Sequence, residues 1–141
     1  MSTIHGSCRC ERVKFTIETP TKFCAHCHCE DCRHSHGAAF VTWVGTLAER
    51  FQITHGKDAI TRYVSPAGAT RSFCSSCGSM LFFQAPRWPG EVHVARAHVR
   101  GPIDREPAAH AYFDRHVPWV HVDDDLPKLG GPTGTHPIGQ G

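Results

Sequence analysis

The sequence has neither a long hydrophobic run nor a concentrated block of charge. Nowhere in its 141 residues do about 18 apolar residues follow one another, so no membrane-spanning helix is expected. The formal net charge is only +2 at pH 7, and the arginines are scattered along the chain. These absences argue against a membrane surface or a nucleic acid as the main partner.

The N-terminal segment also lacks the pattern of a secretory signal. Residues 1–8 contain no basic segment followed by an apolar stretch. We therefore expect a cytoplasmic protein. In that reducing compartment, metal ligation explains the eight cysteines better than disulfide bonds do.

Helical periodicity is weak as well, and no repeat of solenoid length is present. Strand-like segments, which alternate in polarity or are rich in β-branched and aromatic residues, lie at residues 13–18, 37–44, 51–54, 60–64, 70–73, 80–83 and 92–99. A short helix is expected only around residues 29–34. The predicted fold class is therefore all-β, with short loops and little helix.

The chain length fits one compact domain with a modest core. From about residue 123 the sequence becomes rich in proline and glycine. We expect a single zinc-binding domain over residues 1–129, followed by a Pro- and Gly-rich tail over residues 130–141.

The spacing of the cysteines is the most informative feature of the chain. They occur as Cys8 and Cys10, as Cys24, Cys27, Cys29 and Cys32, and as Cys74 and Cys77. Cys-x-Cys and Cys-x-x-Cys strain a disulfide loop, but they let thiolates converge on one ion. Zinc takes four tetrahedral ligands at zinc–sulfur distances of about 2.3 Å, so two zinc sites would use all the cysteines.

The first expected site joins two distant pairs. Cys74-Ser-Ser-Cys77-Gly78 has the form of a zinc knuckle, in which the glycine lets the backbone turn and direct amide groups at sulfur. Cys8 and Cys10 supply the complementary pair, because side chains at i and i+2 of an extended segment lie on the same face. We expect these four thiolates to hold a closed, structural zinc.

The second expected site is built from Cys27, Cys29 and Cys32, and its fourth position is left open by the sequence. Cys24 is a candidate fourth ligand, as are water and substrate. The remaining candidate ligands are the histidines His26, His28, His34 and His36. The alternative interpretation of these residues is that they are solvated side chains of a loop. With three thiolates and an exchangeable position, zinc can hold an incoming thiol as thiolate or polarise a carbonyl oxygen.

The motifs around these cysteines resemble those of the glutathione-dependent formaldehyde-activating enzyme family, also described as centromere protein V-like. One is the run Cys27-His-Cys29-Glu-Asp-Cys32-Arg33. The similarity extends over roughly residues 4–130, with further matching segments at residues 6–15, 37–38, 63–66, 71–79, 106–110, 119 and 125–127.

The resemblance implies a β-tent fold with a structural zinc on Cys8, Cys10, Cys74 and Cys77. It places a second zinc on Cys27, Cys29 and Cys32, whereas Cys24 is not one of the seven cysteines of the family pattern. For the founding members, it implies the joining of formaldehyde to glutathione to give S-hydroxymethylglutathione, which is carbon–sulfur lyase chemistry in reverse.

Two classes of function follow. The first is an enzyme that acts on a small, glutathione-like thiol and an aldehyde at the second zinc. Arg33 or Arg71 is a candidate for binding a carboxylate of the thiol, and the alternative interpretation of each is a surface or structural side chain. The second is a non-catalytic zinc-stabilised binding module, or a zinc-buffering protein, in which Cys24 closes the second site. The oligomeric state stays open, although exposed strand edges permit a dimer.

Overall fold

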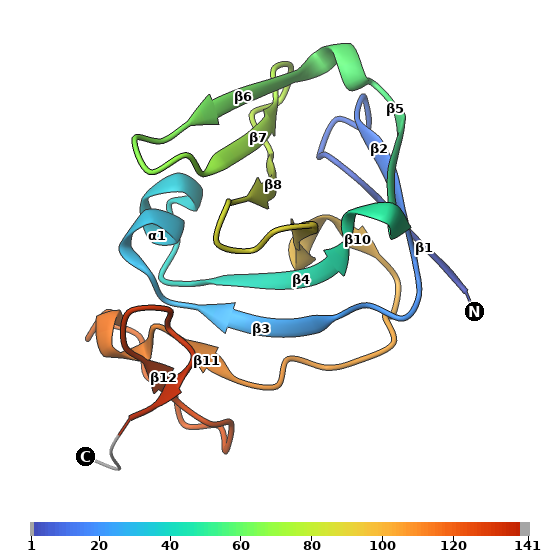
Figure 1. The fold of residues 1–141 in the computed structure, drawn as a ribbon. Coiled ribbons are helices and arrows are strands. Elements are labelled where there is room, and N and C mark those ends of the chain that lie inside the picture. Colours follow the sequence, from blue (N-terminus) through green and yellow to red (C-terminus); the bar gives the residue numbers. More distant parts are fainter. Residues whose placement is uncertain (1, 139–141) are drawn as a thin grey trace. The chain divides into compact units, whose positions relative to one another are not determined.

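The computed structural model describes residues 2–138, most of which lie in β-strands and short connections (Figure 1). The strands are β1 (Thr3–Ser7), β2 (Lys14–Glu18), β3 (Phe23–Cys27), β4 (Val41–Leu47), β5 (Phe51–His55), β6 (Ile60–Val64), β7 (Thr70–Cys74), β8 (Met80–Gln84), β9 (Glu91–Ala95), β10 (Val99–Arg100), β11 (His110–Ala111), β12 (Leu129–Gly130) and β13 (His136–Pro137).

Helices are few and short. The only α-helix of residues 2–138 is α1 (Glu30–His36), and none of the helices in that range is long and apolar enough to cross a membrane. The remaining helical turns are η1 (Ala48–Arg50), η2 (Lys57–Ala59), η3 (Arg96–His98) and η4 (Phe113–Arg115). The prediction of an all-β fold is confirmed.

The chain divides into two compact units. The first comprises the residues up to Phe23 together with Val44–Arg105. The second comprises Cys24–Trp43 together with the residues from Glu106 onward. Each candidate site described below lies within one unit.

The first unit contains two sets of antiparallel strands. One is the four-stranded sheet β10-β1-β2-β5, and in the other β6, β7, β8 and β9 pair in sequence order. Phe15 of β2 and Phe82 of β8 meet edge to face in the core, with ring centroids 5.3 Å apart. Cys8 and Cys74 belong to the same buried cluster, so the first cysteine site borders the hydrophobic core.

The second unit is built around a short parallel ladder. His26 of β3 stands opposite His110 of β11, and Cys27 stands opposite Ala111. The backbone amide of His28 extends this ladder by donating to the carbonyl of Ala111 at 2.9 Å. Side chains alternate along a strand, so His26 and Cys27 point to opposite faces of β3.

Helix α1 begins immediately after the ladder, where Cys29 is the N-cap and its sulfur accepts a hydrogen bond from the amide of Cys32. The helix ends at Gly37, which adopts the left-handed conformation with φ of 58°. The strand expected at residues 37–44 therefore begins only at Val41, because this C-cap turn occupies the start of the expected segment.

Three other expectations from the sequence can be compared with the fold. The turn expected at residues 65–68 joins β6 to β7, with the amide of Gly68 donating to the carbonyl of Ser65 at 2.9 Å. The strand expected at residues 92–99 is interrupted by η3, which separates β9 from β10. Within residues 130–141, expected as a tail, β13 pairs with β12, and residues 139–141 lie outside the described residues.

Candidate metal centres

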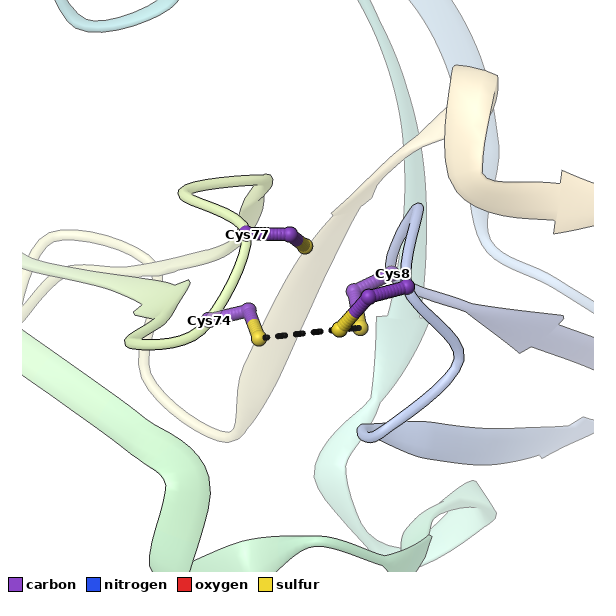
Figure 2. Close-up of side chains that lie close together, drawn as sticks. Cys8, Cys74 and Cys77 are labelled. Carbon is purple, nitrogen blue, oxygen red and sulfur yellow. Dashed lines mark hydrogen bonds between the residues drawn. The ribbon is translucent and has the colours of Figure 1, made fainter.

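Cys8, Cys10, Cys74 and Cys77 converge in the first unit, with their sulfur atoms within 4.8 Å of one another. The sulfur–sulfur separation is 3.6 Å between Cys8 and Cys10 and 3.8 Å between Cys10 and Cys74. A tetrahedron with zinc–sulfur bonds of about 2.3 Å has edges of about 3.8 Å. The four thiols are therefore spaced to fit a single zinc ion, and Figure 2 shows Cys8 facing Cys74 and Cys77.

Backbone and hydroxyl groups support this cluster. The amide of Val13 donates to Cys8 Sγ at 3.3 Å, and Gly78, with φ of 77°, closes the knuckle by donating its amide to the carbonyl of Cys74. The Ser79 hydroxyl, 3.2 Å from Cys77 Sγ, lowers the pKa of that thiol to about 5. The thiolate, which is the metal-binding form, is thus favoured at Cys77.

Cys27, Cys29 and Cys32 form a second cluster in the second unit, again with their sulfur atoms within 4.8 Å. Cys27 ends β3, Cys29 caps α1 and Cys32 lies in the first turn of the helix. The sulfur atoms of Cys27 and Cys32 are 3.5 Å apart, and the amide of Cys32 donates to Cys29 Sγ at 3.2 Å. The strand end and the helix start therefore bring three thiols together without any distant partner.

The crowding of these thiols opposes their ionisation in the absence of a cation. Hydrogen bonds with Cys29 and Cys32 raise the pKa of Cys27, and burial raises it further. A divalent cation at the centre of the cluster relieves the repulsion between three thiolates. Cys27 and Cys29 are intermediate in burial, whereas Cys32 is buried.

The structure does not bring Cys24 into the second cluster. Cys24 is buried in β3, three residues before Cys27, and alternation along the strand directs the two side chains to opposite faces. The three-sulfur group is thus formed without the candidate fourth cysteine.

The histidines considered as ligands of this cluster lie elsewhere. His34 is exposed beside Glu30, 3.8 Å from its carboxylate, and His36 packs edge-on against Trp43. His26 and His28 lie on the face of the β3 ladder opposite Cys27.

The two arginines singled out from the sequence both make contacts in their own units. The Nε of Arg33 donates to the carbonyl of His28 at 3.2 Å, so this guanidinium is held beside the three-cysteine segment. Arg71 is buried in the first unit, and its guanidinium lies 4.7 Å from the centroid of the Phe83 ring.

A polar chain that the sequence did not predict runs through the second unit. His28 Nε2 lies 2.8 Å from His110 Nδ1, and His110 Nε2 lies 2.9 and 3.0 Å from the two carboxylate oxygens of Asp124. The hydrogen bond from His110 lowers the pKa of Asp124, and desolvation lowers the pKa of His28 to about 4. No local spacing could have indicated this chain, because His28 and His110 are 82 positions apart.

The fold and its clusters define an all-β chain with two groups of thiols spaced for metal ligation. The family model described as "Glutathione-dependent formaldehyde-activating enzyme" matches residues 3–115. The chain therefore belongs to this family, and the resemblance inferred from the cysteine motifs is confirmed.

Individual relatives agree with this assignment. A Halomonas elongata protein named "Putative glutathione-dependent formaldehyde-activating enzyme" is 28% identical over 128 residues, covering 85% of this chain and 81% of the relative. A Schizosaccharomyces pombe protein named an uncharacterized lyase is 32% identical over 85 residues, 59% of this chain and 58% of its own length. The crystal structure of a Rhodobacter sphaeroides protein superposes with a TM-score of 0.60 at 26% identity, covering 72% of this chain and 92% of that one.

Proposed function

We propose that this protein is a zinc-dependent enzyme of the carbon–sulfur lyase type that acts on a small thiol such as glutathione and on an aldehyde such as formaldehyde. Membership of the family supports the substrate class. The observation that carries the proposal is the cluster of Cys27, Cys29 and Cys32, which brings three sulfur atoms together without Cys24. Three protein ligands with room for a fourth are typical of catalytic zinc sites.

The two cysteine clusters have different proposed roles. Cys8, Cys10, Cys74 and Cys77 would hold a structural zinc, since four thiolates complete its coordination. Cys27, Cys29 and Cys32 would hold the second zinc, which when bound supplies the acidity that keeps a substrate thiol in its thiolate form.

The residues around the second cluster would position the substrate. The amide of Cys32 donates to Cys29 Sγ and fixes the orientation of that sulfur at the start of α1. The bond from Arg33 Nε to the carbonyl of His28 holds the guanidinium next to the cluster, where it would bind a carboxylate of a glutathione-like thiol. Cys29 is only partly buried, and a small substrate would reach the cluster on its side.

Two-dimensional exchange NMR with isotope-labelled formaldehyde and glutathione tests this proposal directly. Zinc-loaded protein is expected to accelerate the interconversion of free aldehyde and the S-hydroxymethyl adduct over the spontaneous rate. The acceleration should disappear in Cys29→Ser and persist in Cys24→Ala, which removes a buried thiol outside the cluster.

Two other outcomes would argue against this activity. No acceleration by the wild-type protein would exclude this substrate pair. Loss of one zinc equivalent in Cys24→Ala would indicate that Cys24 closes the second site, as expected for a zinc-stabilised binding module.

A further inference from the structure

We propose that His26, His110 and Asp124 form a third metal site, which binds a divalent first-row transition-metal ion such as Zn²⁺ through two imidazole nitrogens and one carboxylate oxygen. One ligand atom from each of the three residues lies within 4.8 Å of the other two. Two histidines and one carboxylate are a donor set that suits zinc and its neighbours in the first transition row.

The ladder between β3 and β11 creates this arrangement. His26 and His110 are direct partners in its parallel register, so their side chains share one face. Their rings lie 4.9 Å apart, centroid to centroid, at an angle of 32°. Asp124 approaches from the following loop, where the amide of Leu126 fixes its carboxylate through a bond to Oδ1 of 3.1 Å.

The Nδ1 atoms of both rings are engaged in hydrogen bonds away from the site, and His110 Nε2 is itself bonded to the Asp124 carboxylate at 2.9 and 3.0 Å. His26 Nδ1 is bonded to the Thr42 hydroxyl at 2.8 Å, and His110 Nδ1 is bonded to His28 Nε2 at 2.8 Å. A metal-binding histidine commonly binds the ion through one ring nitrogen and makes a hydrogen bond through the other. That hydrogen bond orients the ring and sets its tautomer. The Nε2 atoms of His26 and His110 are therefore the expected ligand atoms, and at His110 the metal ion would replace the proton of the hydrogen bond between Nε2 and the Asp124 carboxylate.

The site is separate from the three-cysteine cluster. Cys27 follows His26 directly and points to the other face of the strand, so no thiolate joins the nitrogen and oxygen donors. His110 is almost fully buried, whereas the side chain of Asp124 is 44% exposed. A water molecule or a small ligand would complete the coordination from the exposed side of Asp124.

Metal titration of the full chain tests the third site without reference to catalysis. Protein whose cysteine sites are filled with zinc is titrated with Co²⁺, followed by visible absorption and by metal content after gel filtration. We expect one further equivalent with weak visible bands and no sulfur-to-cobalt charge transfer, because its ligands are nitrogen and oxygen. This result does not depend on the proposed enzyme activity.

Variants assign the ligands. His26→Gln and Asp124→Asn should each abolish the further equivalent, while Thr42→Val, which removes only the support of His26, should weaken it about tenfold. His34→Gln is the matched control, because His34 also stands beside a carboxylate, that of Glu30 at 3.8 Å, but on the exposed surface of α1. Circular dichroism establishes that each variant is folded.

The proposal is overturned if wild-type protein binds no cobalt beyond the cysteine sites. It is equally overturned if the further equivalent survives in Asp124→Asn, which lacks the carboxylate ligand and, because that side chain is 44% exposed, is expected to fold. Loss of the equivalent in His34→Gln would show adventitious surface binding instead.

Discussion

Cys10 and Cys74 are 64 positions apart in the sequence, yet their sulfur atoms lie 3.8 Å apart. This proximity ties the loop after β1 to the end of β7. Cys8 and Cys74 are also members of the buried core of the first unit. An ion held between these segments would contribute its binding free energy to the folding of that unit.

Replacing Cys77 with serine is expected to unfold the first unit. The substitution removes one of four thiolates and leaves the other three crowded around an incomplete site. We expect insoluble protein, or soluble protein without a cooperative thermal transition. Zinc analysis and differential scanning calorimetry measure this outcome.

The neighbouring exposed Ser76 provides the control for this prediction. Its hydroxyl accepts a hydrogen bond from Arg12 at the surface, so Ser76→Ala should change stability by no more than about 0.5 kcal/mol. A folded, cooperative Cys77→Ser protein with less zinc would contradict a structural role for the first site.

Replacing Cys29 with serine is expected to preserve the fold. Cys29 is the N-cap of α1, and serine is itself a favourable N-cap residue, so the helix can form as before. The variant should lose one equivalent of zinc and retain its thermal transition. Cys29→Ala, which lacks both the metal ligand and the cap, should be less stable than Cys29→Ser by about 1 kcal/mol.

Metal analysis and thermal unfolding of these two variants check this prediction together. Global unfolding of Cys29→Ser would indicate that the second cluster is needed for the fold. Equal stabilities of the serine and alanine variants would show that the cap contributes nothing measurable.

Gly6 is expected to tolerate no side chain. It stands opposite Phe15 in the β1–β2 ladder, and a Cβ there would overlap the Phe15 ring and lie 2.6 Å from the backbone oxygen of His98. Overpacking of this kind costs about 1–3 kcal/mol. Urea unfolding of Gly6→Ala measures the loss.

The adjacent exposed residue serves as the comparison for Gly6. His5→Ala on the same strand should lie within about 0.5 kcal/mol of the wild type. Equal stability of Gly6→Ala and the wild type would contradict the close contact between Gly6 and Phe15.

A buried histidine predicts part of the dependence of stability on pH. Burial lowers the pKa of His93 from its ordinary value of 6.5, although the Glu91 carboxylate, 2.9 Å away, opposes this shift. Below pH 6.5 the unfolded chain takes up a proton at this position before the folded chain does. The contribution of His93 to stability is therefore complete above pH 6.5 and falls as the pH decreases toward the folded-state pKa.

Comparison of His93→Gln with the wild type isolates this contribution from the acid sensitivity of the cysteine sites. The destabilisation caused by the substitution should be larger at about pH 7.5 than at about pH 5.5. Urea unfolding at both values measures it. An equal difference at the two pH values would contradict a lowered pKa for His93.

The sequence predicted the strands most reliably where polarity alternates or β-branched residues accumulate. The segments expected at residues 51–54, 60–64 and 80–83 correspond to β5, β6 and β8. The strand β3, with the sequence Phe-Cys-Ala-His-Cys, was missed, because it carries few strand-forming residues and was interpreted only as metal ligands. Two of the boundaries between the compact units, next to Phe23 and Trp43, fall inside β3 and β4, where the sequence pattern gives no sign of a division.

By itself, the sequence determined the β-rich class, the family and the grouping of the cysteines, because ligand spacing and strand patterns are local properties of the chain. Only the tertiary structure decided that His110 meets His26 and Asp124. These relationships depend on strand direction and on pairing between distant segments. Such pairing is selected by the burial of whole faces, and no short motif records it.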